Sequence, residues 1–392
     1  MDKFYIEKVL QKGVTRMQKR WMLLLAIATI LVLAACSEKS TQEKDETSQK
    51  ENEEKQEQNE EKEDPVEVVD KEDEEKKEEE EKKEPEFAYT YPLTGKGTDE
   101  PVNHRIISVM VNNHSKARPQ TGLNQADMVY EVLAEGPITR FLAFYHSEKP
   151  PLVGPVRSAR EYYFRIAKGY NALYLYHGAA QYIENKLKAG YIDHINGMYY
   201  DNDRHLFKRE SFRYAPHNSY LMIRNVYDVA QQKGYEVKKE HKPLPFLNDE
   251  QIKNISGNEA TTINITYSDS PRETVKFEYN QDTQKYTRFN DGSKTADLNS
   301  KEPTTVDNVF IVETGHQVID SKLRRAIDTE SGGNGYLIQK GKVQQVSWKN
   351  VDGRIIPFKD GKKLGFVPGK TWVNIIPESP GIQQSVTFTS PQ

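Results

Sequence analysis

The feature that most constrains this chain is a long acidic segment that cannot form a core. Residues 37–86 carry 24 Asp and Glu against 10 Lys and Arg, and their sizeable apolar residues are Val66, Val68 and Val69. Such a segment buries too little apolar surface to offset the entropy lost on ordering. We therefore expect a disordered spacer, expanded by its like charges, with a single charged helix over Asp70 to Glu84 as the alternative.

A short apolar run precedes this spacer. Trp21 to Ala35 follows a basic stretch and spans about 22 Å as a helix, less than the roughly 30 Å hydrocarbon core of a bilayer. A basic start, a short apolar run and small residues at its end are typical of a secretory signal peptide, which we place at residues 1–35. Met17 is an alternative start of translation, because the residues after it also form an adequate basic region.

The sole cysteine lies at the end of this run. Leu33-Ala34-Ala35-Cys36 resembles the lipobox of bacterial lipoproteins, in which the chain is cut before the cysteine and the cysteine then carries acyl chains such as palmitate. A short buried helix that happens to contain a cysteine is the alternative. We predict a lipid anchor at Cys36 that holds the protein at the extracytoplasmic face of the cell membrane in a Gram-positive type of envelope.

Composition excludes several classes of protein. Hydrophobic residues are 36% and charged residues 29%, too polar for a protein with many membrane spans, and one cysteine permits no intramolecular disulfide framework. Residues 87–392 carry 39 Lys and Arg against 33 Asp and Glu, so the part able to fold is mildly basic. We expect a partner in the cell wall or among envelope proteins, no nucleic acid and no cofactor.

Residues 87–245 are predicted to form a mixed α/β domain. Strands are expected at Arg105–Val111, Met128–Ala134, Ile138–Tyr145 and Ala172–Tyr176, with a hairpin turn at Glu135-Gly136-Pro137. Ser158 and Glu161 have the spacing of a capping box at the start of a helix, and further helices are expected at Ala179–Ala189 and Ser219–Lys233. Tyr191–Asn218 has no clean period, and such long irregular stretches are often functional.

Residues 259–392 are predicted to form a β-rich domain without a long helix. Apolar and polar residues alternate between turn signals along eight segments. These expected strands are Thr261–Tyr267, Glu273–Tyr279, Lys285–Phe289, Val306–Glu313, Gly335–Lys340, Val343–Trp348, Val351–Phe358 and Trp372–Ile376.

No strong catalytic or metal-binding signature is present. The sequence contains no nucleophile elbow, phosphate-binding loop or zinc-protease motif. Asp201-Asn202-Asp203 resembles the start of a calcium loop, but Leu206 and Phe212 stand where that loop needs Gly and Glu. The nine histidines are dispersed, so no metal is expected.

Polar residues at the ends of predicted elements suggest an anion site. Arg157 and Arg160 flank the expected helix start, where free N–H groups and the helix dipole favour an anion. Arginine also binds carboxylate and phosphate through two parallel hydrogen bonds. The alternative is that these arginines pair with Glu135 and Glu161 and only fix the loops. The candidate binding residues are Arg118, Glu135, Arg157, Arg160, His177, His217 and Asn218.

Carboxylates suggest a weaker, enzymatic alternative. Glu131 and Glu135 lie four residues apart on one strand, roughly 13 Å along it, which exceeds the spacing of paired glycosidase carboxylates. Asp127, Asp193 or Glu135 could still act together with a histidine, His177 or His217. The catalytic residues of such an extracytoplasmic hydrolase of wall glycan or peptide stay unknown.

Five segments carry a resemblance to a known family. Val109–Gly122, Gln125–Phe141, Gly154–Arg160, Ala215–Asn218 and Pro368–Trp372 resemble the YerB-like lipoproteins of Gram-positive bacteria. The resemblance covers roughly residues 100–380. It implies a membrane-anchored lipoprotein with an N-terminal mixed α/β domain of a layered type and a C-terminal domain, and it supplies no catalytic residues. The leading hypothesis is thus a lipoprotein that binds an anionic wall component or an envelope protein.

Overall fold

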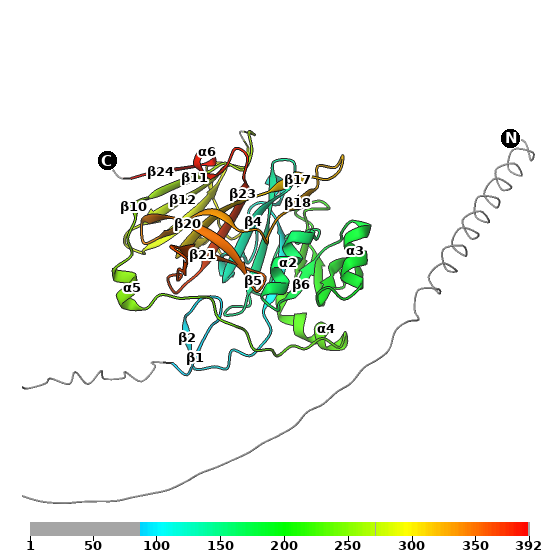
Figure 1. Ribbon diagram of the computed structural model, residues 1–392. Coiled ribbons are helices and arrows are strands. Elements are labelled where there is room, and N and C mark those ends of the chain that lie inside the picture. Colours follow the sequence, from blue (N-terminus) through cyan, green and yellow to red (C-terminus); the bar gives the residue numbers. More distant parts are fainter. Residues whose placement is uncertain (1–86, 271, 391–392) are drawn as a thin grey trace, which may run out of the picture. The chain divides into compact units, whose positions relative to one another are not determined.

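The folded part is built on one large mixed sheet (Figure 1). The computed structural model describes residues 87–270 and 272–390, so the predicted signal peptide, Cys36 and the acidic spacer lie outside the described residues. Twelve strands form this sheet, in the order β22-β21-β20-β19-β16-β23-β4-β5-β3-β6-β7, with β10 paired to β20. Among the described residues, no helix is long and apolar enough to cross a membrane.

Strands from both halves of the chain contribute to the large sheet. The N-terminal half supplies β3 (Ile107–Asn112), β4 (Met128–Glu135), β5 (Ile138–Tyr145), β6 (Leu173–Tyr176) and β7 (His194–Asn196). The C-terminal half supplies β10 (Asn258–Glu259), β16 (Asn308–Thr314), β19 (Gly333–Gln339), β20 (Lys342–Val351), β21 (Arg354–Lys359), β22 (Lys362–Lys363) and β23 (Thr371–Pro377). The predicted hairpin is confirmed, because β4 pairs antiparallel with β5 across Gly136 and Pro137.

Strand β23 joins the two halves. It runs parallel to β16 on one side and parallel to β4 on the other, with Trp372 opposite Val129. The described residues, 87–270 and 272–390, accordingly belong to one compact unit. The sheet continues across the predicted division between residues 245 and 259, because β23 of the second segment pairs with β4 of the first.

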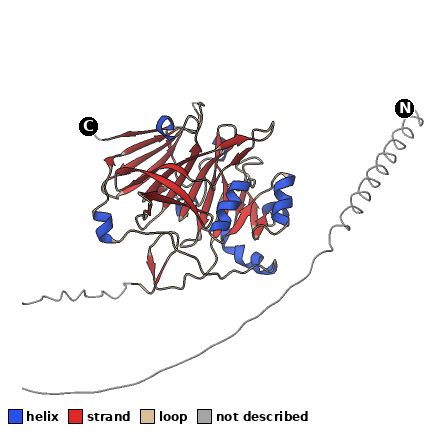
Figure 2. Ribbon diagram, viewed as in Figure 1, coloured by secondary structure: helices blue, strands red, loops and turns tan. Residues whose placement is uncertain are grey.

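A smaller sheet packs with the large one (Figure 2). Its order is β14-β13-β12-β11-β24, with β15 paired to β13. Its strands are β11 (Thr262–Ile265), β12 (Val275–Asn280), β13 (Lys285–Asn290), β14 (Ser293–Lys294), β15 (Thr305–Val306) and β24 (Val386–Thr389). Separate pairs are β1 (Tyr89–Thr90) with β2 (Gly97–Thr98), β8 (Phe207–Arg209) with β9 (Ser219–Leu221), and β17 (His316–Val318) with β18 (Arg325–Ile327).

The helices are short. They are α2 (Glu161–Gly169), α3 (Gln181–Lys188), α4 (Val226–Gln232), α5 (Asp249–Lys253) and α6 (Ile382–Ser385). Single 3₁₀ turns are η1 (Ser115–Ala117), η2 (Leu123–Gln125), η3 (Gly197–Tyr200) and η4 (Ile223–Asn225). The described chain is therefore strand-rich, with α2 and α3 beside β6 in Figure 1.

The continuous apolar runs of the sequence become strands buried on both faces. Along β4, Val129 and Leu133 belong to one core cluster, and Tyr130 and Val132 belong to the other. A strand that is buried on both faces has apolar residues on both, so its sequence does not alternate between apolar and polar residues. Helices α2 and α3 contribute to the second cluster, and α4 contributes to the first.

Two predicted helix starts are wrong. Helix α2 begins after Arg160, not after Ser158, and its N-cap residue makes no side-chain capping hydrogen bond. Residues 219–221 form strand β9, which pairs with β8, so the third helix is confined to Val226–Gln232. Both errors have one cause: pairing with distant strands holds residues 153–156 and 219–221 extended, against their local helical signals.

Candidate anion-binding site

Three neighbouring strands of the large sheet end at the same edge. Strand β6 runs parallel to β3 on one side and to β7 on the other, so Asn112, Tyr176 and Asn196 lie at one carboxyl edge. Ligands of open α/β sheets commonly bind outside this edge. His177 follows β6 directly and is therefore placed there, as its position in the sequence predicted.

A cavity of about 400 Å³ opens at this edge, and we call it the Arg157 pocket. It lies between the segment before α2, the turn after β6, η3, and the loop between β8 and β9. Its lining includes Arg157, Ser158, His177, Gly178, Ala179, Met198, Asp201, Arg209, Ala215, Pro216 and Ser219.

The Arg157 guanidinium has no partner among the described residues. Its backbone is fixed on both sides, because its N–H donates to Met110 O (2.8 Å) and its carbonyl accepts from the His177 N–H (3.0 Å). Burial, together with the charge of Arg140, lowers the pKa of Arg157 to about 10, so the group is still charged at neutral pH. A half-buried charge without a partner is costly, and an anion in the pocket would compensate it.

His177, Asp201 and Arg209 form a paired group on one wall. His177 Nε2 lies 3.2 Å from Asp201 Oδ1, and Arg209 Nε lies 2.8 Å from the same oxygen. Burial lowers the pKa of His177 and outweighs the opposite effect of Asp201, so the ring is neutral at pH 7. The Asp201 carboxylate is thus balanced by Arg209, and Arg157 remains the uncompensated charge of the pocket.

Two further donors point to a ligand in the pocket. Ser219 is only 2% exposed, and its Oγ has no hydrogen-bond partner among the described residues. Helix α3 begins beside the pocket without a side-chain cap, so the N–H groups of Gln181 and Tyr182 have no acceptor among the described residues. A buried hydroxyl and an uncapped helix start can both donate to an anion.

His217 lies beside this pocket and belongs to a basic cluster. Its Nδ1 accepts from the Asn112 side-chain amide (2.9 Å), so its remaining ring proton is on Nε2. Its ring packs against His114 at 4.7 Å between centroids. Burial, with His114 and Arg157 adding to it, lowers the pKa of His217 to about 4. The next residue, Asn218, accepts from Arg209 Nη1 (2.7 Å).

The other three candidate residues lie outside the pocket and are engaged elsewhere. Arg160 forms an ion pair with Glu135, which also accepts from Arg140 Nη2 (2.6 Å). Arg118 pairs with Glu273 and with Asp291 (2.6 Å). The predicted capping box is absent: Ser158 O accepts from Arg140, and Glu161 pairs with Arg165 and Lys186. Thus the structural alternative describes Arg160 and Arg118, whereas Arg157 is free.

The carboxylates of the enzymatic alternative do not contact either histidine. Asp127 is buried and accepts from the His146 and Ser147 N–H groups, and Asp193 pairs with Arg105 (2.5 Å). Glu135 holds its two arginines. Among the described residues, no cluster of His, Cys, Asp and Glu could hold a metal ion.

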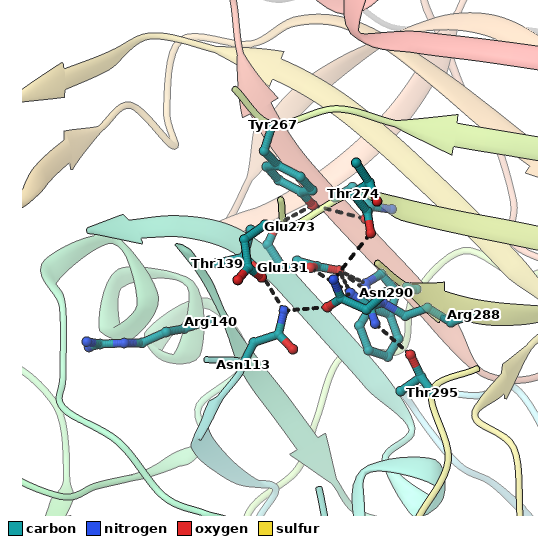
Figure 3. Close-up of polar contacts among 12 residues, drawn as sticks. Asn113, Glu131, Thr139, Arg140, Tyr267, Glu273, Thr274, Arg288, Asn290 and Thr295 are labelled. Carbon is teal, nitrogen blue, oxygen red and sulfur yellow. Dashed lines mark hydrogen bonds and ion pairs between the residues drawn. The ribbon is translucent and has the colours of Figure 1, made fainter. Parts of the chain in front are cut away.

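Glu131 is the centre of a buried network between the two halves of the chain (Figure 3). Arg288 donates to both of its oxygens from Nη2 (2.8 and 2.9 Å), and Thr139 and Trp372 Nε1 donate to them as well (2.9 Å each). Arg288 also stacks over the Trp372 ring at 4.8 Å. Since its acceptors are satisfied, Glu131 stabilises the junction and is not a free catalytic group.

The sequence interpretation missed four groups of the pocket: Asp201, Arg209, Ser219 and the uncapped start of α3. Asp201 had a signal, because it lies in the irregular stretch Tyr191–Asn218, but it was considered only as a calcium ligand. Ser219 had no such signal in the sequence, since a helix rather than strand β9 was expected there. The stretch that was predicted to be functional does supply two sides of the pocket.

Comparisons with known proteins agree with these observations. Two domains described as "Protein of unknown function (DUF3048)" match, the N-terminal one at residues 93–236 and the C-terminal one at residues 263–373. "Putative lipoprotein YerB" of Bacillus subtilis (strain 168) is 45% identical over 289 residues, 73% of this chain and 86% of that protein. A crystal structure of YerB from Bacillus subtilis matches with a TM-score of 0.71 and 42% identity, and covers 77% of this chain and all of that chain.

Proposed function

The chain belongs to the YerB-like lipoprotein family, and from this premise we propose that it is a membrane-anchored lipoprotein that binds an anionic group of an envelope component in the Arg157 pocket. The observation that carries the proposal is the half-buried Arg157 guanidinium, which has no partner among the described residues and faces a cavity of about 400 Å³. Ser219 Oγ supports it as a buried donor without a partner.

The anchor in this proposal is Cys36, with residues 1–35 removed and the folded part on the extracytoplasmic face. The support is the lipobox-like ending Leu33-Ala34-Ala35-Cys36 of a run too short to span a bilayer. Cys36→Ala should leave an uncleaved precursor or release the protein from membranes. Unchanged size and unchanged retention after washing without detergent would contradict the anchor.

Titration of the full chain with inorganic phosphate tests the pocket. Each charge-assisted hydrogen bond contributes roughly 1.5–3 kcal/mol, and 1.4 kcal/mol is about a factor of ten in affinity. Arg157→Gln should therefore weaken phosphate binding by at least tenfold without lowering the melting temperature, because it removes a half-buried charge that has no partner in the fold. Arg160→Gln is the matched control: it should lower stability and leave phosphate binding within about twofold, because Arg160 pairs with Glu135.

Binding is the first candidate function, and hydrolysis stays the second, because His177 pairs with the Asp201 carboxylate in the lining of the same pocket. Neither Asp127 nor Glu135 contacts His177 or His217, so none of the carboxylate–histidine pairs considered from the sequence is assembled. Incubation with purified cell wall and analysis of the soluble products separates the two functions. We expect retention on the wall without release of fragments; soluble fragments would favour the hydrolase.

A further inference from the structure

The most exposed hydrophobic side chains of the described residues gather around one pocket. Tyr214 is 90% exposed, Tyr199 68%, Met198 60% and Phe212 57%, and no other large hydrophobic side chain in the described ranges exceeds these values. Met198 and Tyr199 belong to η3, and Phe212 and Tyr214 belong to the loop between β8 and β9. Both segments contribute to the lining of the Arg157 pocket, the first through Met198 and the second through Ala215 and Pro216. Contiguous exposed apolar groups of this kind mark interaction sites.

The fold holds these side chains at the rim. Met198 lies over the turn after β6, since a Cβ on Gly178 would come within 3.0 Å of its sulfur. Tyr214 directly precedes Ala215 and Pro216, which line the pocket. Phe212 packs near Tyr220 (6.1 Å between centroids) and under the Arg213 guanidinium. Phe212 and Tyr214 are thus exposed aromatic residues on the loop whose next residues, Ala215 and Pro216, line the pocket together with Arg157.

Polar groups that suit hydroxyls lie between the cation and the rim. Asp201 is an acceptor and Arg209 is a donor, and both line the pocket, whereas the Asn218 amide is engaged by Arg209 and by Glu210 O. The Asp201 carboxylate, although it is paired with Arg209 and His177, can accept further hydrogen bonds and therefore suits a ligand that brings hydroxyl donors close to its anionic group. A sugar ring supplies such hydroxyls, together with a C–H face that packs on an aromatic ring.

We propose that the Arg157 pocket and its rim bind an anionic saccharide, with its phosphate or carboxylate at Arg157, its hydroxyls at Asp201, and its ring face on Tyr214. This inference rests on the proposed function and names the class of ligand. A lipid phosphate fits less well, because charged Asp201, Arg209 and Arg213 interrupt the apolar rim. A phosphopeptide also fits less well, because it has a phosphate but no sugar ring that carries hydroxyl groups.

The test is calorimetric titration of the full chain in detergent with four probes. These are N-acetylglucosamine 1-phosphate, inorganic phosphate, a phosphoserine tripeptide and dihexanoyl phosphatidic acid. We expect the sugar phosphate to bind at least tenfold more tightly than inorganic phosphate and more tightly than the other two probes. Tyr214→Ala should weaken sugar phosphate binding about tenfold and leave inorganic phosphate unaffected, since one stacked aromatic contact has about this effect.

Controls separate the inference from the proposed function. Tyr89→Ala removes another exposed tyrosine, on β1, and should change no affinity. If inorganic phosphate binds and Arg157→Gln abolishes it, but the sugar phosphate is no tighter or Tyr214→Ala has no effect, the saccharide inference is overturned and the anion pocket stands. Tighter binding of the tripeptide or of phosphatidic acid overturns it too. If no probe binds, the proposed function itself fails.

Discussion

Arg157 and Arg160 lie three residues apart and differ in what surrounds their guanidinium groups. Arg160 is buried against Glu135 and donates from Nη1 to Ala159 O (2.6 Å), so its charge is compensated within the fold. Arg157 is half-buried with no such partner among the described residues. The same side-chain group therefore stabilises the fold at Arg160 and is available for binding at Arg157.

Buried histidines make the stability of the fold depend on pH. His104 and His146 stack at 4.1 Å, and His241 packs on His146 at 5.4 Å. Burial lowers the pKa of His146 to about 3 and that of His241 to about 4, from 6.5. Below pH 6.5 the unfolded chain therefore takes up protons that the folded chain does not, and the folded state loses stability as pH falls toward 3.

We predict that the free energy of unfolding falls between pH 6.5 and 5, with up to about 2 kcal/mol from His146 alone. Urea unfolding at pH 7, 6 and 5 measures this fall. The matched variant is His146→Asn, which should be less stable at pH 7 but show a shallower dependence on pH. An equal slope in both proteins would show that other groups dominate.

The Glu131–Arg288 pair should be essential to the junction of the two halves. Their side chains are 0% and 1% exposed, and removal of one partner leaves a buried charge unpaired. Arg288→Met should lower the free energy of unfolding by about 3–5 kcal/mol. The double variant Glu131→Leu with Arg288→Met should recover part of that loss in urea unfolding. Additive losses in the double variant would contradict this account of the pair.

At the scale of elements, α2 packs unusually closely on the turn between β20 and β21. A Cβ on Gly169, the last residue of α2, would overlap the backbone carbonyl of Gly353 in that turn. Gly169→Ala should therefore lower the free energy of unfolding by about 1–3 kcal/mol, although alanine favours helices elsewhere. Urea unfolding checks this, with exposed Lys168→Ala as the control that should lose less than about 1 kcal/mol.

The same scale explains which elements the sequence could predict. Strands β4 and β5 have long apolar runs separated by a turn that contains Gly and Pro, so their signal is local. The Ser158–Glu161 box failed because bridges from Gly154 to Thr121 and from Val156 to Val111 keep the chain extended up to the helix. Asn248 and Gln251, within the predicted linker, do form a capping box, at the start of α5.

In the candidate site, too, local features could be predicted from the sequence and distant contacts could not. His177 could be placed at the carboxyl edge, because its position after a strand is a local property. The partners that decide what each arginine does are distant in sequence: Asp291 and Glu273 for Arg118, and Glu135 for Arg160. No local pattern could therefore distinguish the free Arg157 from its paired neighbours.

For the whole molecule, the shared sheet predicts cooperative unfolding. Strand β23 hydrogen-bonds to β16 and β4, so neither half keeps its strand pairing when the other unfolds. Calorimetry should show a single transition, and Trp372→Ala, which removes a buried ring and a donor to Glu131, should lower its temperature without splitting it. Two separate transitions would instead mean that the halves are independent domains.

The most direct test of the central claim is a crystal structure of the folded part grown or soaked with phosphate. We predict an anion in the Arg157 pocket, within hydrogen-bond distance of the Arg157 guanidinium and of Ser219 Oγ, and its absence in Arg157→Gln crystals treated identically. An empty pocket in the wild-type crystal, or phosphate bound only at other surface arginines, would contradict the account.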